Sequence, residues 1–417
     1  MCPAWNGSTR SSPICSSTGS LTRSRHDSRI HPVDRRYRVG IIGGGQLARM
    51  MQQAAIALGI EVRLLAEASD ASAAQVIPLT TVGDHDDEET LAAFAGDCDV
   101  ITFDHEHVPT ALLRRLGDEV AVRPGPHALQ FAQDKALMRQ RLSGMGVPCP
   151  RFAICRDEEQ LLAFGREEGW PIIAKTSRGG YDGKGVWRLD APDEAAEPFR
   201  GKPEVSAGEE VVIVAEEFID FERELSVVVA RSPRQAVVYP VSETVQRDGV
   251  CVETITPAPG LPDGKAAELQ ELGLRIAGEL DVVGVLAVEL MAARDGRVVV
   301  NELAMRPHNT GHWSIDGART SQFENHLRAV LDLPLGSPAM TCDVAVMANV
   351  LGGAETDLTG ALQHVHARDP EVAVQLYGKQ VRPGRKVGHV TACDSDRDRA
   401  LARARHAARY LMGDPDA

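Results

Sequence analysis

The sequence predicts an α/β domain with a doubly wound parallel sheet, followed by a larger α+β region. From residue 37 onward, short apolar runs alternate with stretches that are apolar at helical spacing, which is typical of a parallel sheet covered by helices. Beyond about residue 130 this alternation gives way to a series of strand-like runs. The 417 residues are 43% hydrophobic, which is enough apolar content for several cores.

The first domain opens with a short apolar run that ends in Gly43-Gly44-Gly45 and continues into an apolar helical pattern. This order predicts a strand, a tight glycine turn and a helix. The expected elements are strands at 37–42, 61–65 and 99–103, and helices at 46–58 and from about residue 88. We place the end of this domain near residue 130, before a helix expected at 132–145.

The second region begins with a β-hairpin whose strands, 170–175 and 186–189, flank a glycine-rich segment. Further strands are expected at 211–215, 224–230, 236–240, 284–291 and 297–300, with helices at 265–280 and 397–412. The chain is therefore expected to divide into a disordered extension at 1–36, a doubly wound domain at 37–130, a central domain at 131–350 with a lid at about 150–215, and a small C-terminal cap at 351–417.

Composition and charge exclude several classes of protein. The formal charge is −14 and no stretch concentrates Lys and Arg in the way that binding a phosphate backbone requires, so nucleic acid is not an expected partner. The most apolar stretch, 282–293, is about 12 residues long, whereas a membrane span needs roughly 20, so no membrane partner is expected. Eight widely spaced cysteines without zinc-type spacing indicate reduced thiols and a cytoplasmic protein.

The glycine turn at Gly43–Gly45 has two interpretations. It fits the pattern G-x-G-x-x-A directly after a strand, and Glu67 stands where a ribose-binding acid would follow, so a dinucleotide site is one possibility. Alternatively, such a turn needs glycine for backbone reasons alone. The sequence leaves both interpretations open.

A second glycine-rich element, Gly179 to Gly185, lies between the two strands of the hairpin. Lys175 ends the first strand, and Tyr181, Asp182 and Lys184 stand among the glycines. Backbone N–H groups in such a segment can close over an anion, which favours a phosphate lid. The segment is not a Walker A loop, because Gly185 follows Lys184 where Ser or Thr is required. A surface hairpin without a ligand is the alternative.

Two carboxylates occupy apolar strands in the second region. Glu289 lies within one strand, and Glu302 follows Asn301 at the end of the next. A carboxylate in an apolar strand is costly unless it is paired or bound to a metal. Two of them on neighbouring strands would give Mg²⁺ the oxygen ligands that it prefers beside nucleotide phosphates. A structural ion pair with a nearby arginine is the alternative.

Three further groups of polar residues resemble parts of a binding site. Residues 306–309 place an arginine, a histidine and an asparagine in one loop, as substrate handling requires. Residues 216–219 follow an apolar strand and precede Glu224, a pattern compatible with adenine and ribose contacts. The basic run from Lys379 to Lys386 would hold an anion, although a solvated turn has the same composition.

Four segments occur along the chain in a characteristic order. They are Gly43-Gly-Gly-Gln-Leu-Ala-Arg-Met50, Gly179-Gly-Tyr-Asp-Gly-Lys-Gly185, Asn301-Glu-Leu-Ala-Met-Arg-Pro-His-Asn-Thr-Gly-His-Trp313 and Arg382-Pro-Gly-Arg-Lys-Val-Gly-His389. Together they resemble the N5-carboxyaminoimidazole ribonucleotide synthetases, a family of ATP-grasp ligases, over about residues 37 to 395. The resemblance implies an ATP-grasp architecture with the doubly wound domain first, a central two-lobed ATP-grasp region and a small C-terminal cap.

The resemblance implies an enzyme of de novo purine (IMP) biosynthesis. ATP and bicarbonate would give carboxyphosphate, whose carboxyl group passes to the exocyclic amine of 5-aminoimidazole ribonucleotide. The products would be N5-carboxyaminoimidazole ribonucleotide, ADP and phosphate, with Mg²⁺ as the metal and a homodimer as the assembly. The alternatives are another ATP-grasp carboxylate-activating ligase and, from the turn at Gly43, a nicotinamide-dependent oxidoreductase.

The resemblance also implies roles for individual residues. ATP would be bound by Lys135, Lys175, Gly180, Tyr181, Asp182, Gly183, Lys184, Gly185, Val186, Glu216, Glu217, Phe218, Ile219, Glu224, Gln246, Asn301 and Glu302. The ribonucleotide would contact Glu106, Tyr181, Asp182, Lys184, Arg306, His308, Lys379 and Arg385. The catalytic group would be Arg306, His308 and Asn309, near bicarbonate, with Asp182 and Lys184. Mg²⁺ would be held by Glu289 and Glu302.

Four positions depart from the family pattern. The family usually has Arg in place of Lys135 and Lys in place of Arg139, so Lys135 keeps a cation but loses the guanidinium fork. Gln246 replaces a usual His, which changes one expected nucleotide contact. Asp104 is a shortened carboxylate in the segment Phe103-Asp-His-Glu-His-Val108, and the resemblance gives it no role.

Overall fold

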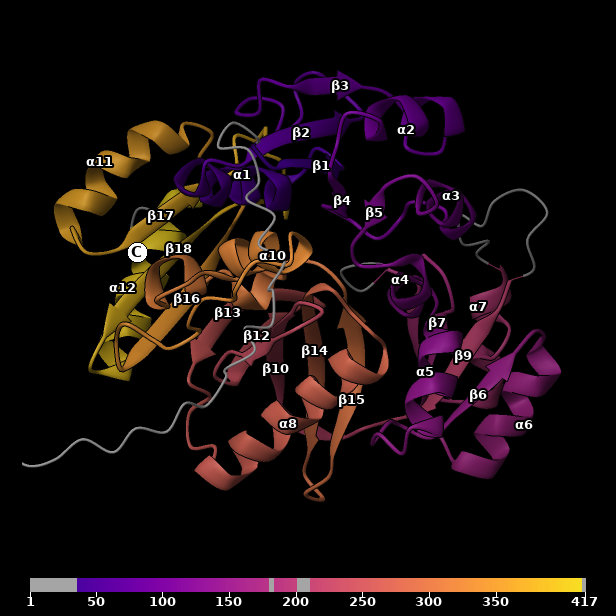
Figure 1. The fold of residues 1–417 in the computed structure, drawn as a ribbon. Helices are drawn as coiled ribbons and strands as arrows, with labels where there is room; N and C mark the ends of the chain where they lie inside the picture. Colours follow the sequence, from indigo (N-terminus) through magenta and orange to yellow (C-terminus); the bar gives the residue numbers. More distant parts are fainter. Residues whose placement is uncertain (1–35, 180–183, 201–210, 415–417) are drawn as a thin grey trace, which may run out of the picture. The chain divides into compact units, whose positions relative to one another are not determined.

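The computed structural model describes residues 36–179, 184–200 and 211–414. The extension expected at 1–36 lies outside these residues except for Arg36, and so do Gly180, Tyr181, Asp182 and Gly183 of the expected lid. Three β-sheets, of five, nine and four strands, organise the described part of the chain (Figure 1). In that part, no helix is long and apolar enough to cross a membrane.

The five-stranded sheet is parallel throughout, in the order β3-β2-β1-β4-β5, as the alternating pattern predicted. Its strands are β1 (Arg38–Ile42), β2 (Glu61–Ala66), β3 (Thr80–Val82), β4 (Val100–Phe103) and β5 (Ala121–Val122). Its helices are α1 (Gln46–Leu58), α2 (Glu88–Ala95) and α3 (Thr110–Leu116). The strand order reverses beside β1, and ligands of such sheets bind at the carboxyl ends of the strands next to this reversal.

The glycine turn after β1 is packed against the segment that follows β4. Gly43 has a φ of +103°, and a Cβ atom there would lie 2.6 Å from the His105 ring. A Cβ atom at Gly45 would lie 2.1 Å from a carboxylate oxygen of Asp104. The other oxygen of Asp104 accepts the backbone N–H of Ala48 at 2.8 Å. Steric contact therefore explains the glycines, and a carboxylate takes the helix N-terminus that a dinucleotide phosphate would need.

The prediction of a single helix at 132–145 is wrong, because the structure has two helices in this region. They are α4 (Pro126–Gln133) and α5 (Lys135–Gly144). Between them, Asp134 accepts the N–H groups of Ala136 and Leu137 at 3.0 and 3.2 Å and thereby caps α5. The apolar spacing continues across this break, so periodicity alone did not reveal the cap.

The four-stranded sheet is antiparallel, in the order β6-β9-β7-β8. Its strands are β6 (Phe152–Cys155), β7 (Ile172–Thr176), β8 (Val186–Leu189) and β9 (Ile213–Glu217). The helices α6 (Glu158–Glu168) and α7 (Glu197–Arg200) and the 3-10 turn η1 (Pro192–Glu194) accompany it. The predicted hairpin is thus formed by β7 and β8, and the glycine-rich segment connects them.

The nine-stranded sheet has the order β15-β14-β10-β12-β13-β16-β18-β17, with β11 paired to β10. Its strands are β10 (Phe221–Arg231), β11 (Ala236–Val238), β12 (Ser242–Arg247), β13 (Val250–Thr256), β14 (Gly284–Ala293), β15 (Val298–Ala304), β16 (Val344–Leu351), β17 (Ala373–Leu376) and β18 (Lys386–Asp394). The accompanying helices are α8 (Asp263–Glu279), α9 (Ser314–Gly317), α10 (Gln322–Val330), α11 (Leu358–Arg368), α12 (Arg397–Leu411) and the 3-10 turn η2 (Asn309–Gly311).

This sheet continues from the central region into the C-terminal residues. Strand β13 pairs with β16, where Glu253 stands opposite Ala348. The residues expected to form a small cap therefore add two strands, β17 and β18, to the sheet that carries the expected metal ligands, next to β16 at the end of the expected central domain. The domain limits drawn from the sequence stay predictions.

A buried charge cluster joins α5 to three strands. Arg139 has a fully buried side chain, and its Nε donates to Glu216 Oε1 at 2.6 Å. Its other nitrogens donate to the backbone oxygens of Val300 at 3.1 Å and Asn301 at 2.7 Å. Lys175 Nζ lies 2.9 Å from Glu216 Oε2. The Glu216 carboxylate of β9 thus binds Lys175 of β7 and Arg139 of α5, and Arg139 in turn binds β15. Removing a single partner would leave a buried charge uncompensated.

The pKa of Glu216 reflects this position. Burial alone would raise it, but the charges of Lys175 and Arg139 and their hydrogen bonds outweigh burial and lower the pKa to about 2. The carboxylate is therefore ionised in the folded chain at neutral pH.

We expect the stability that Glu216 provides to depend on pH. Because its pKa is lower in the folded chain than the ordinary 4.5, the contribution is complete above pH 4.5 and is lost as the pH falls toward 2. The wild-type chain should have a higher free energy of unfolding than Glu216→Gln at pH 7. This difference should be smaller by about 2 kcal/mol at pH 3. Urea unfolding of both proteins measures this difference, and an equal difference at both pH values would contradict the assigned ion pairs.

Candidate active site

A cavity of about 990 Å³ is lined by residues of the four-stranded and nine-stranded sheets and by the segments that follow β1 and β4 of the five-stranded sheet. Such a volume is at the upper end of the usual range for small-molecule sites. Sixteen of the residues assigned from the sequence line it, and they are Glu106, Lys135, Lys175, Val186, Glu216, Glu217, Phe218, Ile219, Glu224, Gln246, Glu289, Asn301, Glu302, Arg306, His308 and Asn309. The fold therefore brings most of the expected site together.

Other assigned residues lie elsewhere. Within the described ranges, Lys184, Gly185, Lys379 and Arg385 do not line this cavity. Gly180 to Gly183 are outside the described residues. Conversely, the cavity is also lined by Gln46, Asp104, His312 and Lys386, which the sequence did not assign to the site. Lys386 lies in the basic run that was predicted to hold an anion. Gln46 was not assigned because a single glutamine after a glycine turn indicates no particular chemistry.

The two expected metal ligands face each other across paired strands. Glu289 of β14 stands opposite Glu302 of β15. Glu302 Oε1 lies 3.0 Å from Lys135 Nζ, and Glu289 Oε1 lies 3.2 Å from His308 Nε2. Each carboxylate thus contacts a cavity residue, and the alternative of an ion pair with arginine does not apply to these contacts.

The charge around these carboxylates is not balanced. Burial, followed by the charges of Glu302 and Glu224, raises the pKa of Glu289 to about 8. Burial also raises the pKa of Glu224. Burial and the charges of two neighbouring acids thus disfavour the ionisation of Glu289, and a divalent cation at its oxygens would stabilise the ionised form.

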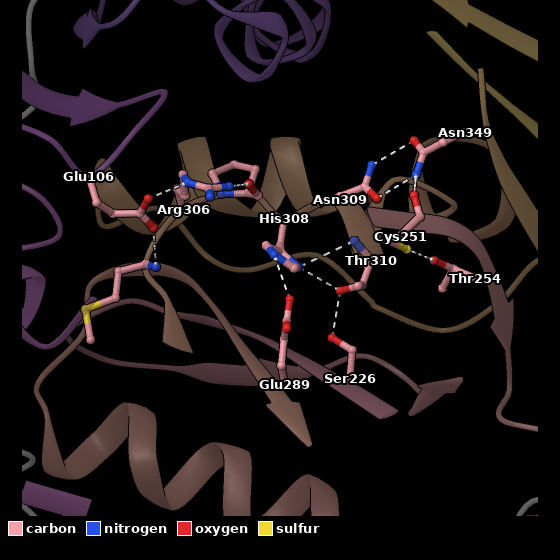
Figure 2. Close-up of polar contacts among 12 residues, drawn as sticks. Glu106, Ser226, Cys251, Thr254, Glu289, Arg306, His308, Asn309, Thr310 and Asn349 are labelled. Atoms are coloured by element: carbon pink, nitrogen blue, oxygen red, sulfur yellow. Dashed lines mark hydrogen bonds and ion pairs between the residues drawn. The ribbon is translucent and has the colours of Figure 1, made fainter. Parts of the chain in front are cut away.

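The loop after β15 supplies a neutral histidine and a cation (Figure 2). Burial, followed by the charges of Arg306 and Lys386, lowers the pKa of His308 to about 3. The Nδ1 atom of His308 accepts the backbone N–H of Thr310, so its hydrogen is on Nε2 and donates to Glu289. The Oγ1 of Thr310 is in turn 2.6 Å from Ser226 Oγ, which fixes the ring from the other side.

Arg306 is held by a residue from the first domain. Its Nε donates to Glu106 Oε2 at 2.7 Å, and the other oxygen of Glu106 accepts the N–H of Met305 at 3.1 Å. Figure 2 shows this carboxylate reaching Arg306 from the segment after β4. Glu106 therefore orients the guanidinium group.

Asn309 has a structural partner on the C-terminal part of the sheet. Its amide nitrogen donates to Asn349 at 2.9 Å, and the amide nitrogen of Asn349 donates back at 2.8 Å (Figure 2). Asn349 also donates to the backbone oxygen of Cys251 at 2.8 Å. Both polar atoms of the Asn309 side chain are thus occupied, and they fasten the loop to β16 and β13.

In the segment expected to bind adenine, residues 216–219, the two glutamates already have partners within the protein. Glu216 is taken up by Arg139 and Lys175, and Glu217 lies within hydrogen-bond distance of Arg297 and Arg151, at 2.9 Å and 3.3 Å. Strand β9 ends at Glu217, and the following residues belong to no strand until β10 begins at Phe221. The backbone oxygens of Ile219 and Asp220 accept the N–H groups of Phe221 and Arg294, both at 3.0 Å, so recognition of a base would involve the backbone of Phe218 and the N–H of Ile219.

The basic loop before β18 docks at the edge of the cavity. Lys379 Nζ donates to Gln46 Oε1, and Gln46 lines the cavity. The neighbouring Gly378 accepts a hydrogen bond from Gln75 at 2.8 Å through its backbone oxygen. Arg385 donates to the backbone oxygen of Gln380 at 3.3 Å. The loop is thus fixed to the first domain, and Lys379 contacts a residue that lines the cavity.

Three family models match successive parts of the chain. The model of the ribonucleotide synthetase preATP-grasp domain matches residues 37–133, and that of the ATP-grasp domain matches residues 140–323. The model of the phosphoribosylaminoimidazole carboxylase C-terminal domain matches residues 345–403. The ATP-grasp architecture predicted from the sequence is confirmed.

The chain is 52% identical over 382 residues to N5-carboxyaminoimidazole ribonucleotide synthase of Mycobacterium tuberculosis, with 89% of this chain and 87% of that protein covered. The solved N5-carboxyaminoimidazole ribonucleotide synthetase from Thermus thermophilus matches this chain with a TM-score of 0.80 at 35% identity. The match covers 90% of this chain and 99% of the Thermus chain. The Aspergillus clavatus N5-carboxyaminoimidazole synthase in complex with ADP and 5-aminoimidazole ribonucleotide has a TM-score of 0.81 at 30% identity, with coverages of 90% and 98%.

These similarities decide between the alternatives that the sequence left open. The relatives are ligases of one kind, and neither a nicotinamide oxidoreductase nor another ATP-grasp ligase accounts for them. The chain belongs to the N5-carboxyaminoimidazole ribonucleotide synthase family of ATP-grasp ligases.

Proposed function

We propose that the cavity holds ATP, Mg²⁺, bicarbonate and 5-aminoimidazole ribonucleotide together. By its family the chain is an ATP-dependent ligase of purine biosynthesis that makes N5-carboxyaminoimidazole ribonucleotide. A bicarbonate oxygen attacks the γ-phosphorus of ATP and ADP leaves; the exocyclic amine then attacks the carboxyl carbon, and phosphate and a proton leave. The observation that carries the proposal is the convergence of Lys135, Lys175 and the paired Glu289 and Glu302 in one cavity.

Lys135 and Lys175 are the proposed contacts of the ATP phosphates. Lys135 faces Glu302 at 3.0 Å, and Lys175 faces Glu216 and the amide oxygen of Asn301, both at 2.9 Å. Both ammonium groups are therefore held in place before ATP binds. Phosphoryl transfer depends chiefly on such positioning and on neutralisation of charge. The lid role of Gly180 to Val186 stays a prediction.

Glu289 and Glu302 are the proposed Mg²⁺ ligands, with Glu224 beside them. The residues fit the ion because β14 and β15 place Glu289 opposite Glu302 at the cavity, where burial and the charge of Glu302 raise the pKa of Glu289 to about 8. When bound, Mg²⁺ would neutralise phosphate oxygens of ATP. Lys135 keeps Glu302 ionised, because its charge counteracts the effect of burial and the pKa of Glu302 is lowered.

Arg306 and His308 are the proposed contacts of bicarbonate. Arg306 supplies a positive charge, held by Glu106, and His308 supplies a neutral ring held by Glu289 and Thr310. Asn309 is better suited to positioning this loop, because Asn349 uses both of its polar atoms.

Lys379 and Arg385 are the proposed partners of the ribonucleotide phosphate at the edge of the cavity. Lys379 contacts Gln46, which lines the cavity, so the phosphate would lie between the basic loop and the turn after β1. The homodimer and the cytoplasmic location stay predictions.

We expect phosphate release to depend on the ribonucleotide. With ATP, Mg²⁺ and bicarbonate, the purified chain should release phosphate slowly, and addition of 5-aminoimidazole ribonucleotide should accelerate release many-fold because carboxyphosphate is then consumed by the amine. A coupled phosphate assay measures both rates, with a reaction lacking bicarbonate as control. Equal rates with and without the ribonucleotide would contradict the proposed reaction.

Glu302→Gln should lower kcat/KM by at least about 100-fold, because a neutral amide at this position weakens the metal contact and the stabilisation of charge in phosphoryl transfer. Its Mg²⁺ titration should shift to higher concentration. Glu222→Gln is a matched control, since Glu222 is exposed on β10 and does not line the cavity. If Glu302→Gln keeps the wild-type rate and Mg²⁺ dependence, Glu302 is not a metal ligand.

A further inference from the structure

Glu67, His85 and His105 form a second cluster of metal-ligating side chains, and the proposed reaction uses none of them. They follow β2, β3 and β4, three strands of the parallel sheet whose carboxyl ends meet at one edge. One ligand atom from each residue lies within 4.8 Å of the others. The cluster therefore arises from the topology of the sheet and not from neighbours in sequence.

The distances within the cluster are close to those of a coordinated metal. Zinc bonds of 2.0–2.2 Å at tetrahedral angles place two ligand atoms about 3.3 Å apart. His105 Nε2 lies 3.4 Å from Glu67 Oε1, and His85 Nδ1 lies 4.0 Å from the same oxygen. A small rotation of the His85 ring would complete a three-ligand set. Because about half of the Glu67 side chain is exposed, water can reach a fourth position.

Neighbouring groups already orient both rings. The second nitrogen of His85 faces the carboxylate of Asp86 at 3.6 Å, which is the arrangement that outer carboxylates adopt toward metal-bound histidines. The ring of His105 packs on Gly43, where even a Cβ atom would collide with it. The rings of His85 and His105 lie edge to face at 4.9 Å between centroids. Both imidazoles are thus held beside Glu67.

The donor set selects the kind of ion. Two imidazole nitrogens and one carboxylate oxygen suit Zn²⁺ and other divalent transition metals, whereas Mg²⁺ prefers oxygen alone. Glu67 is ionised at neutral pH, because the hydrogen bond from His105 holds its pKa at about 2. We propose that Glu67, His85 and His105 bind one divalent transition-metal ion, with water as the fourth ligand, at a site separate from the proposed Mg²⁺ ligands.

Metal binding would change one contact in the loop. His105 Nδ1 accepts the backbone N–H of His107 at 3.2 Å, so coordination through Nε2 moves the ring hydrogen to Nδ1 and opens this hydrogen bond. Because His105 lines the cavity and precedes Glu106, the ion would anchor the segment that orients Arg306. Metal binding at this site is therefore expected to affect the position of Glu106 and Arg306 at the cavity.

The test is competition for Zn²⁺ between the full-length, chelator-treated protein and a chromophoric chelator at pH 7.5. One Zn²⁺ should bind per chain, and His105→Ala and Glu67→Gln should each weaken its affinity by at least about 10- to 100-fold. His107→Ala is the matched control and should leave the affinity unchanged, because His107 adjoins the cluster without belonging to it. Millimolar Mg²⁺ should not displace the Zn²⁺.

Thermal unfolding shows whether a variant that fails to bind Zn²⁺ is still folded. Without metal, Glu67→Gln should melt at the wild-type temperature, and Zn²⁺ should raise the melting temperature of the wild-type chain and of His107→Ala only. Bound Co²⁺ should give the absorption of a four-coordinate ion in those two proteins. Absence of stoichiometric Zn²⁺ binding would overturn the proposal, and so would wild-type Zn²⁺ affinity in His105→Ala and Glu67→Gln.

Discussion

The contact between Arg139 and Glu216 is the interaction on which the rest of the active site depends. It lies in the interior. It holds Lys175 through the second oxygen of Glu216, and it holds the middle of β15 through the backbone oxygens of Val300 and Asn301. Asn301 and Glu302 belong to this part of β15, so the proposed phosphate and metal contacts share one buried support. A buried charge network of this kind contributes little net stability, but the loss of one member is expensive. Its value here is the fixed placement of reactive groups.

This placement resolves an apparent conflict of charge. The chain carries a formal charge of −14, and both proposed substrates are anions. The cations at the cavity are few, and carboxylates hold most of them: Glu302 holds Lys135, Glu216 holds Lys175 and Glu106 holds Arg306. Ion pairs formed before binding keep these side chains ordered, and the proposed anionic ligands with Mg²⁺ would complete the balance. The net charge thus describes the surface, while the site relies on local pairs.

Local patterns predicted the fold where one element determines its own structure. The helix at 46–58 and the strand that becomes β14 were found because their periodicity and burial agree. The break at Asp134 was missed because the apolar spacing continues through it. The union of β13 with β16 was missed because pairing between segments about 90 residues apart leaves no local pattern. The roles of Glu106 and Asn349 as supports of Arg306 and Asn309 were hidden for the same reason.

The dependence of the ATP site on Arg139 is tested most directly by the dissociation constant for ATP in the presence of Mg²⁺. Arg139 does not line the cavity, so Arg139→Gln removes no contact with the nucleotide itself. We predict that the variant binds ATP at least about tenfold more weakly, because Lys175 and the middle of β15 lose their support. Arg141→Gln, on the exposed face of the same helix, should bind as the wild type does. An Arg139→Gln protein with wild-type affinity for ATP would contradict the central role of the buried pair.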